Sequence, residues 1–192
     1  AESPRVILNL GGIANISVLE PGHAPRGSDT GPANMLSDNW SALHTGQSFD
    51  KGGQWGARGH VIEALLTRLI DDEPWFQKSF PKSTGRDLFN ISWLDERLAN
   101  YKKMPVASAQ AIDIQATLQA FTARTVAMAI ASLKAQNWPI FVCGGGALNE
   151  ALMLKLAHET QAAISTTDEL GVPPQDVEAA AFAWLAWAHV QR

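Results

Sequence analysis

The sequence predicts an α/β fold in which helices flank a mixed β-sheet of about five strands, with a helical insertion. Two apolar runs, Val6–Leu10 and Ile13–Leu19, flank a Gly-Gly pair and are typical of a β-hairpin. A wholly apolar run, Ile140–Cys143, precedes three glycines and is typical of a buried strand. Stretches with helical apolar spacing separate these runs, so the predicted order is βββαβαβα.

The composition is that of a globular protein with a core. The chain has 192 residues, of which 46% are hydrophobic, and a net charge of −4, which fits a single domain over residues 1–192. No basic block stands out, so nucleic acid is not expected as a partner. No apolar run is long enough to cross a membrane. The only cysteine is Cys143 and the histidines lack metal spacing, so we expect a cytoplasmic location and no metal site.

The N-terminal elements follow from short-range patterns. The Gly-Gly pair is expected to supply the positive φ angles of a tight hairpin turn. A third short strand ends near Asp29, where a Gly-Pro pair follows. Apolar spacing then predicts a helix over Asn34–His44.

Residues 45–108 are predicted to form a helical and loop insertion within the domain. The stretch Gly46–Gly59 is glycine-rich and polar, which indicates a loop. A helix that places Val61, Leu65, Leu66 and Leu69 on one face follows it. Another helix is predicted to start near Asn90.

The longest helix is predicted to start between Ser108 and Asp113, with one of these two residues as its N-cap, and to run to about Gln136. Its main apolar stripe comprises Ile114, Leu118, Phe121 and Met128.

The C-terminal part continues the alternation of strands and helices. A helix over Ala147–Thr160, a short strand over Ala163–Thr166 and a last helix over Asp176–Val190 are predicted. The residues of the last helix expected to face inward are Val177, Ala181, Trp184 and Ala188.

Two glycine turns after strands are candidate ligand sites, namely Gly11-Gly12 and Gly144–Asn149. Ligands of open α/β sheets lie beyond the carboxyl ends of the strands. The second turn leaves room for a flat base or a ribose, with helix amides nearby. Asp29 lies beside glycines, which let a backbone approach a ligand closely, so it can lie next to a phosphate or a sugar. The alternative is a structural hairpin and an ordinary Asp turn.

The segment Lys82–Arg86 is the densest cluster of positive charge and hydroxyls in the chain. Lys82, Ser83 and Arg86 can all donate hydrogen bonds, so they are candidate contacts for an anion. The alternative is a solvated turn before the next helix.

Seven stretches resemble the anhydro-N-acetylmuramic acid kinase family, and they follow the order of the family nearly from end to end. They are Leu8–Ser17, Asp29–Asn34, Pro81–Phe89, Gln115–Leu118, Val142–Asn149, Thr166–Gly171 and Val177–Ala186. The chain departs from the family pattern at Ser28 and Ala33, where the family usually has Phe and Gly. The resemblance implies the actin-like ATPase fold, which is ribonuclease H-like.

The resemblance also implies a reaction. The family uses ATP, with Mg²⁺ carried on its phosphates, to open the anhydro bridge of anhydro-N-acetylmuramic acid. The product is N-acetylmuramic acid 6-phosphate, formed in cell-wall recycling in bacteria.

By motif match, Asp29 is the base that activates water. The resemblance places Gly11, Gly12 and Asn15 at the phosphates, and Gly144, Gly145, Gly146 and Asn149 at the adenosine. It has Gly31 and Asn34 shape the turn that aims Asp29. Glu178 faces the sugar on this interpretation, and the alternative is a charge favoured at a helix N-terminus.

The resemblance implies that the chain is the C-terminal lobe of a two-lobed kinase. The start at Ala1, with a strand within six residues, is what we expect of a piece of a longer protein. The first phosphate loop of the family is absent from this chain, so we expect the chain alone not to turn over. The expected partners are the N-terminal lobe and a second copy in a homodimer. The alternatives are a non-catalytic nucleotide-binding module and an actin-like phosphotransferase with another small substrate.

Overall fold

The structure is a computed structural model that describes residues 2–102 and 109–191. Five strands form one sheet in the order β3-β2-β1-β4-β5. Their bounds are β1 (Arg5–Leu10), β2 (Ile13–Leu19), β3 (Arg26–Pro32), β4 (Ile140–Cys143) and β5 (Ile164–Thr166). The first three strands pair antiparallel, whereas β1 with β4 and β4 with β5 pair parallel. The predicted mixed sheet is therefore confirmed.

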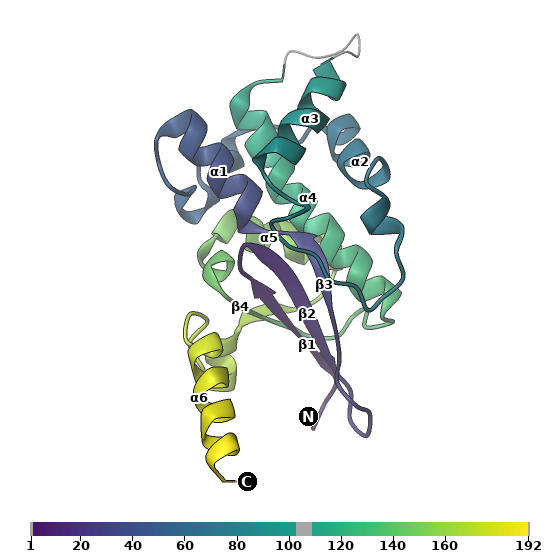
Figure 1. Cartoon of the computed structure of the whole chain (residues 1–192), viewed down its shortest axis with the longest axis vertical. Helices are drawn as coiled ribbons and strands as arrows, with labels where there is room; N and C mark the ends of the chain where they lie inside the picture. Colours follow the sequence, from purple (N-terminus) through teal and green to yellow (C-terminus); the bar gives the residue numbers. More distant parts are fainter. Residues whose placement is uncertain (1, 103–108, 192) are drawn as a thin grey trace.

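Helices cover one face of the sheet and lie beyond one end of its strands (Figure 1). The α-helices are α1 (Asn34–Thr45), α2 (Glu63–Asp71), α3 (Ile91–Lys102), α4 (Ala111–Ser132), α5 (Glu150–Thr160) and α6 (Val177–Val190). Short 3₁₀ helices are η1 (Lys51–Gly53), η2 (Gly56–Arg58), η3 (Pro74–Gln77), η4 (Gly145–Leu148) and η5 (Thr167–Leu170). The fifth helix starts at Glu150 rather than at the predicted Ala147, because the glycines before it form η4.

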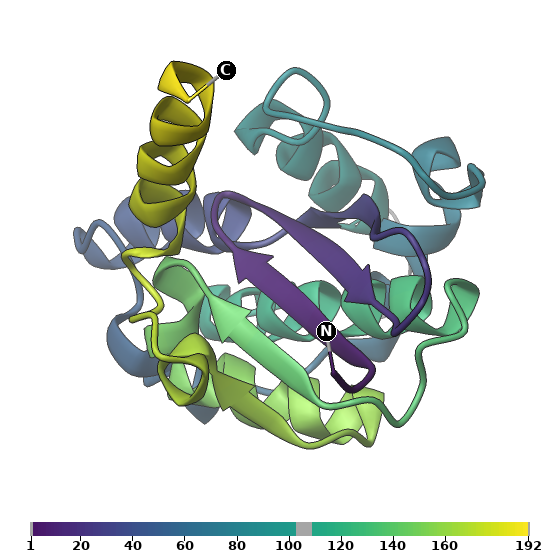
Figure 2. The same ribbon diagram turned by 90° about the horizontal axis from the view of Figure 1, so that it is seen from below.

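The two faces of the sheet differ in burial. Alternate residues of β1 and β2 are buried, and they pack with α4 and α5 into one apolar core. The residues between them are only half-buried. Figure 2 looks onto this second face, with α4 and α5 behind the sheet. An open sheet face is thus available for a site.

A second core lies between α1, α2, α3 and the first half of α4, and aromatic rings dominate it. Phe76 lies 5.5 Å from Phe121 and 5.7 Å from Phe89 between ring centroids, and Trp93 stacks on Phe121 at 6.1 Å. The described part of the segment, residues 45–102, therefore shares a core with the helices that flank it. Its status as an insertion within a single domain stays a prediction.

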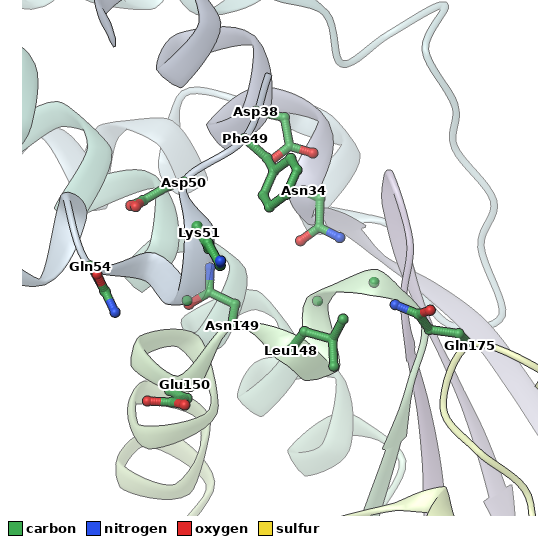
Figure 3. Close-up of a pocket in the computed structure, with 13 residues that line it drawn as sticks. Asn34, Asp38, Phe49, Asp50, Lys51, Gln54, Leu148, Asn149, Glu150 and Gln175 are labelled. Carbon is green, nitrogen blue, oxygen red and sulfur yellow. The ribbon is translucent and has the colours of Figure 1, made fainter. Parts of the chain in front are cut away.

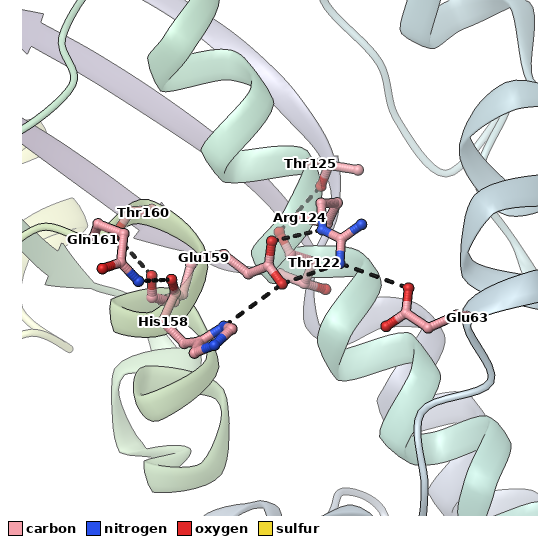
Figure 4. A network of polar contacts seen from close by, with 9 residues as sticks. Glu63, Thr122, Arg124, Thr125, His158, Glu159, Thr160 and Gln161 are labelled. Carbon is pink, nitrogen blue, oxygen red and sulfur yellow. Dashed lines mark hydrogen bonds and ion pairs between the residues drawn. The ribbon is translucent and has the colours of Figure 1, made fainter.

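Polar contacts join the helices on the far side of the sheet (Figure 4). The Nε of Arg124 donates to Glu159 Oε2 at 2.6 Å, and its Nη2 donates to Glu159 Oε1 at 3.2 Å. The same Nη2 lies 3.8 Å from Glu63 Oε2. These contacts link α4 to α5 and α2. Arg124 is partly exposed, so we assign the cluster at most about 1 kcal/mol of stability.

The longest helix differs from its prediction at both ends. The N-cap of α4 is Gln110, so Asp113 is not the cap, and Ser108 lies outside the described residues. Asp113 accepts instead from the N–H of His60 at 2.8 Å. The helix ends at Ser132 rather than near Gln136, because Lys134 takes a positive φ of 57°.

The predicted stripe of α4 was wrong at Met128, whose side chain is 37% exposed. The first half of α4 packs into the aromatic core. The residues of its second half that pack into the core beneath the sheet are Ala123, Val126, Ala129 and Ile130. The buried side of the helix therefore changes along its length.

The inward face predicted for α6 was wrong, because none of its described residues is buried. Trp184 is 61% exposed and Trp187 is 60% exposed, and Val177, Ala181 and Ala188 are not buried either. The helix projects away from the rest of the molecule after the two prolines that precede it (Figure 1). A helix that is apolar on all sides normally lies inside a larger body.

Glu73 is a buried carboxylate that joins η3 to α3. It accepts from the Trp75 N–H at 3.1 Å, from Trp93 Nε1 at 2.8 Å and from Arg97 at 3.0 Å. Burial opposes its ionisation, but the hydrogen bonds and the Arg97 charge outweigh burial and lower the pKa of Glu73. A lowered folded-state pKa adds stability that is present above the ordinary pKa and is lost as the pH falls through the folded one.

We predict that Glu73→Gln destabilises the chain by about 2 kcal/mol at pH 7, because the charged hydrogen bonds are lost. The loss of stability between pH 7 and pH 3 should be smaller in this variant than in the wild type. Urea unfolding at several pH values measures both quantities. An unchanged pH dependence would contradict the assigned role of this carboxylate.

Candidate functional site

The hairpin turn between β1 and β2 is bonded to the start of α1. The carbonyl of Gly11 accepts from the Asn34 N–H at 3.0 Å, and that of Gly12 accepts from Ala33 at 3.0 Å and Met35 at 3.2 Å. The side-chain amide of Asn34 also donates to the Leu10 carbonyl at 3.0 Å. The first amides of α1 are thus occupied by the turn.

The expected positive φ angles at Gly11 and Gly12 were wrong, because neither glycine takes one. The strands close at the Leu10–Ala14 pair, which leaves three residues in the turn instead of the two that require positive φ. An added Cβ at either position would meet no atom closer than 3.6 Å. Within the described ranges neither N–H of these glycines makes a hydrogen bond, so the turn presents two donors that a ligand can reach.

The second glycine turn is packed against the end of β1. Gly144 has a φ of 82°, and an added Cβ there would lie 2.5 Å from Asn9 Oδ1. A Cβ at Gly146 would lie 2.6 Å from the Leu10 Cβ. By contrast, a Cβ at Gly145 would meet only Asn34, at 3.7 Å. The fold therefore requires the outer two glycines, and only the middle one has open space beside it.

Two cavities meet at this turn. The first has a volume of about 530 Å³ and lies between the α1–η1 region and the start of α5 (Figure 3). The second has a volume of about 630 Å³ and lies on the open face of the sheet, beside Gly11 and Gly12. Gly145 and Gln175 line both cavities, so one elongated ligand can occupy the two together.

The first cavity is lined mainly by hydrogen-bond acceptors and neutral groups. Burial, and then the charge of Asp50, raise the pKa of Asp38 to about 6. Both carboxylate oxygens of Asp50 already accept hydrogen bonds, from the N–H groups of Trp55 and Gly56, each at 2.8 Å. Lys51 is the only cation on the wall. This chemistry suits a base or a ribose better than a phosphate.

Asn149, which also lines the first cavity, caps α5. Its Oδ1 accepts from the Leu152 N–H at 2.9 Å. An added Cβ at Gly53 would collide with its side chain, so Asn149 also fixes where η1 meets α5.

A polar row crosses the open face of the sheet. Asn15 pairs with Asp29 on one side and with Asn9 on the other, and Asn9 pairs with Cys143. Directly paired residues face the same side of a sheet. The register shifts beside Asn15, where Thr30 is the extra residue, and such bulges re-aim neighbouring side chains. Asn9 was not among the predicted site residues, although a polar residue between two leucines indicates an outward-facing position.

Asp29 is held by a loop that is distant in sequence. The N–H of Thr84 donates to Asp29 Oδ2 at 2.9 Å, and the Asp29 N–H donates to the Lys82 carbonyl at 3.0 Å. No described residue donates a hydrogen bond to Asp29 Oδ1. Gly31 has a φ of 132°, and a Cβ there would lie 3.0 Å from the Phe76 ring. The turn after Asp29 thus requires this glycine, whereas Ala33, with a φ of −114°, needs none.

The three predicted anion contacts differ in their surroundings. The Lys82 ammonium donates to the carbonyls of Trp75 and Phe76. Ser83 is exposed, and its carbonyl accepts from Trp75 Nε1 at 2.9 Å. Arg86 is also exposed, and a guanidinium nitrogen lies 3.8 Å from the place of a Cβ on Gly12. The structure therefore brings Arg86 to the hairpin turn.

Glu178 reaches the second cavity from the first turn of α6. Burial, and then the charge of Glu178, raise the pKa of the Cys143 thiol at the end of β4. Residues 2–102 and 109–191 contain no group of three His, Cys, Asp or Glu side chains that could hold a metal ion. No helix of that part of the chain is long and apolar enough to span a membrane.

Comparison with known proteins places this arrangement in a family. A sequence model of anhydro-N-acetylmuramic acid kinases matches residues 1–192. The chain belongs to the anhydro-N-acetylmuramic acid kinase family. The kinase of Bordetella petrii is 53% identical over 192 residues, and that of Burkholderia mallei is 47% identical over 202 residues.

The match covers only part of these kinases. It includes 100% of the chain and 50% of the Bordetella petrii kinase, and 97% of the chain and 51% of the Burkholderia mallei kinase. The chain thus spans about half the length of the curated relatives it matches.

Two solved structures share the fold. The activator of the 2-hydroxyisocaproyl-CoA dehydratase from Clostridium difficile, with bound ADPNP, superposes with a TM-score of 0.52 at 19% identity, over 90% of this chain and 55% of that one. Component A of the Acidaminococcus fermentans (R)-2-hydroxyglutaryl-CoA dehydratase superposes with a TM-score of 0.51 at 16% identity, over 84% of this chain and 54% of that one. The actin-like ATPase fold of this kinase family member is thereby confirmed.

The two glycine turns should respond differently to alanine. We predict that Gly144→Ala destabilises the chain by about 2 kcal/mol or more, because its positive φ is costly for alanine and its Cβ would collide. Gly12→Ala should change stability by less than about 0.5 kcal/mol, since the Cβ has room. Urea unfolding of both variants tests this difference, and a strongly destabilised Gly12→Ala chain would contradict the free space described at the hairpin.

Proposed function

We propose that the chain is the ATP-binding C-terminal lobe of a kinase that opens anhydro-N-acetylmuramic acid and phosphorylates it to N-acetylmuramic acid 6-phosphate. One observation carries the proposal. Asp29, with one carboxylate oxygen held by Thr84 and the other open, lies in the same polar row as Asn15, next to a turn with two unused N–H groups. The row and the adjoining turn thus combine a base with hydrogen-bond donors for an anion. Membership of the kinase family supports this assignment.

In the proposed reaction, Asp29 accepts a proton from the water that attacks the anomeric carbon. The bond from that carbon to the bridging oxygen breaks, and this oxygen attacks the γ-phosphate of ATP, with ADP as the leaving group. A carboxylate at hydrogen-bond distance suits the proton transfer. In this proposal the amides of Gly11 and Gly12 neutralise charge on the phosphates. Mg²⁺ is proposed to arrive bound to ATP and to supply further positive charge.

The nucleotide is proposed to occupy both cavities. The base and ribose suit the first cavity because its wall holds acceptors and neutral groups, with Asn149, Gly145 and Gly146 as one side. The phosphates then pass Gly145 toward the hairpin turn and Asn15. Arg86 and Ser83 are the proposed anion contacts there, and Glu178 is proposed to face the sugar.

The proposed partner is the other lobe of the kinase. The chain spans about half the length of its relatives, and the apolar helix α6 lies uncovered beside the open face of the sheet. A homodimer is the competing use of this surface. The single, buried Cys143 fits the proposed cytoplasmic location.

A non-catalytic nucleotide-binding module is the second candidate function. It is favoured for the isolated chain because the chain covers only half of its relatives, so part of a two-lobed site lies outside it. Measurable phosphorylation of the anhydro sugar by the isolated chain would exclude this second candidate.

We predict that Asp29→Asn, in a protein of the relatives' full length, lowers kcat at least about a hundredfold, since general base catalysis contributes that much. ATP binding should stay within about twofold of the wild type, because the carboxylate does not form the nucleotide cavities. Product formation from anhydro-N-acetylmuramic acid, with calorimetry of ATP binding, checks both. Near-normal turnover would remove Asp29 as the base.

We also predict that the half of the Bordetella petrii kinase that this chain does not cover binds the chain when the two are co-expressed. Trp184→Ser should weaken the complex by about tenfold or more, because exposed aromatic residues dominate such interfaces. Leu154→Ser is the matched control, since Leu154 is 74% exposed on α5. Sedimentation analysis that finds only homodimers, or equal effects of both variants, would reject the proposed contact.

A further inference from the structure

The segment Pro81–Thr84 runs beside β3 and bonds to it at Ser28 and Asp29. The Asp29 N–H donates to the Lys82 carbonyl and the Lys82 N–H donates to Ser28 Oγ, both at 3.0 Å. The Thr84 N–H then reaches Asp29 Oδ2 at 2.9 Å. More than 50 residues separate the two segments, so the local chain does not determine where this loop lies. Contacts with other segments must hold it, and one of them is the bond from Trp75 Nε1 to the Ser83 carbonyl at 2.9 Å.

The side chain of Lys82 supplies a second set of contacts. Its Nζ donates to the carbonyl of Phe76 at 3.1 Å and to that of Trp75 at 3.2 Å. The same nitrogen lies 4.2 Å from the Trp75 ring and 4.7 Å from the Phe80 ring, close enough for attraction between a cation and the ring faces. The ammonium thus joins the loop to η3.

No residue in the described part of the chain forms an ion pair with this ammonium. Burial, and then the charge of Lys78, lower the pKa of Lys82. None of the ion pairs of the described residues contains Lys82. The carbonyls and rings therefore offset the cost of burying the charge. Two of the three N–H donors of the ammonium are already used and are not free for a ligand.

We propose that Lys82 is a positioning residue for Asp29. Its ammonium fixes the loop, the loop places the Thr84 N–H, and that N–H holds Oδ2 so that Oδ1 faces the reacting water. The catalytic meaning rests on the proposed function, whereas the placement of the carboxylate does not. Holding the base in one orientation raises the fraction of molecules in which it can take the proton.

NMR of the 192-residue chain tests the placement without any need for turnover. In the wild type, the Thr84 amide should be protected from exchange with solvent, because it donates to the Asp29 carboxylate; this protection is the Thr84 response. In Lys82→Met the Thr84 amide should exchange about tenfold faster, as expected when one hydrogen bond is lost. The Leu8 amide in the sheet should exchange as in the wild type.

Lys78→Met is the matched control, because Lys78 is an exposed lysine four residues away. It removes the same charge and should leave the Thr84 signal unchanged. Lys82→Arg retains a cation above the rings and should restore part of the response. A folded Lys82→Met chain with the wild-type Thr84 response would overturn the proposal. Global unfolding of both Lys82 variants would also overturn it, because Lys82 would then hold the whole fold.

The two proposals can fail separately. Near-normal turnover of Asp29→Asn in the full-length protein would remove the base while the Thr84 response remained. An unchanged Thr84 response in Lys82→Met would remove the positioning role while the loss of turnover in Asp29→Asn remained.

Discussion

The hydrogen bonds between the hairpin turn and the start of α1 determine the rest of the site. The carbonyls of Gly11 and Gly12 accept from the first amides of α1, so the N–H groups of the turn are left for a ligand. The same bonds bring Asn34 against the end of β1, where it lines the first cavity. Both cavities and the exit of β3 thus adjoin one short junction.

The glycines around this junction serve two different purposes. Gly31 and Gly144 have positive φ and neighbours that leave no room for a Cβ, so the backbone requires them. Gly12 and Gly145 have space beside them, so the fold does not explain their presence, whereas the proposed approach of a nucleotide would. A glycine-rich motif in a sequence therefore mixes structural positions with ligand-facing ones, and the packing around each glycine separates them.

Burial is unevenly distributed over the molecule. One face of the sheet and the aromatic core are covered, while the open face and α6 are not. A helix as apolar as α6 gains stability only when its whole circumference is covered. The uncovered surface adjoins the second cavity through Glu178. The proposed N-terminal lobe, if it covers α6, would therefore also adjoin the proposed phosphate site.

Local patterns determined much of this protein. The alternation in β1 and β2 and the apolar run at β4 were sufficient to predict the mixed sheet, and the ordered motifs were sufficient to predict the family. Tertiary structure alone decided that Thr84 holds Asp29, that Arg86 reaches Gly12, and that Asn9 joins the polar row. It also decided that Trp184 is uncovered. The physical reason is that periodicity reports which face of an element is apolar, whereas contacts between distant segments depend on how the elements pack.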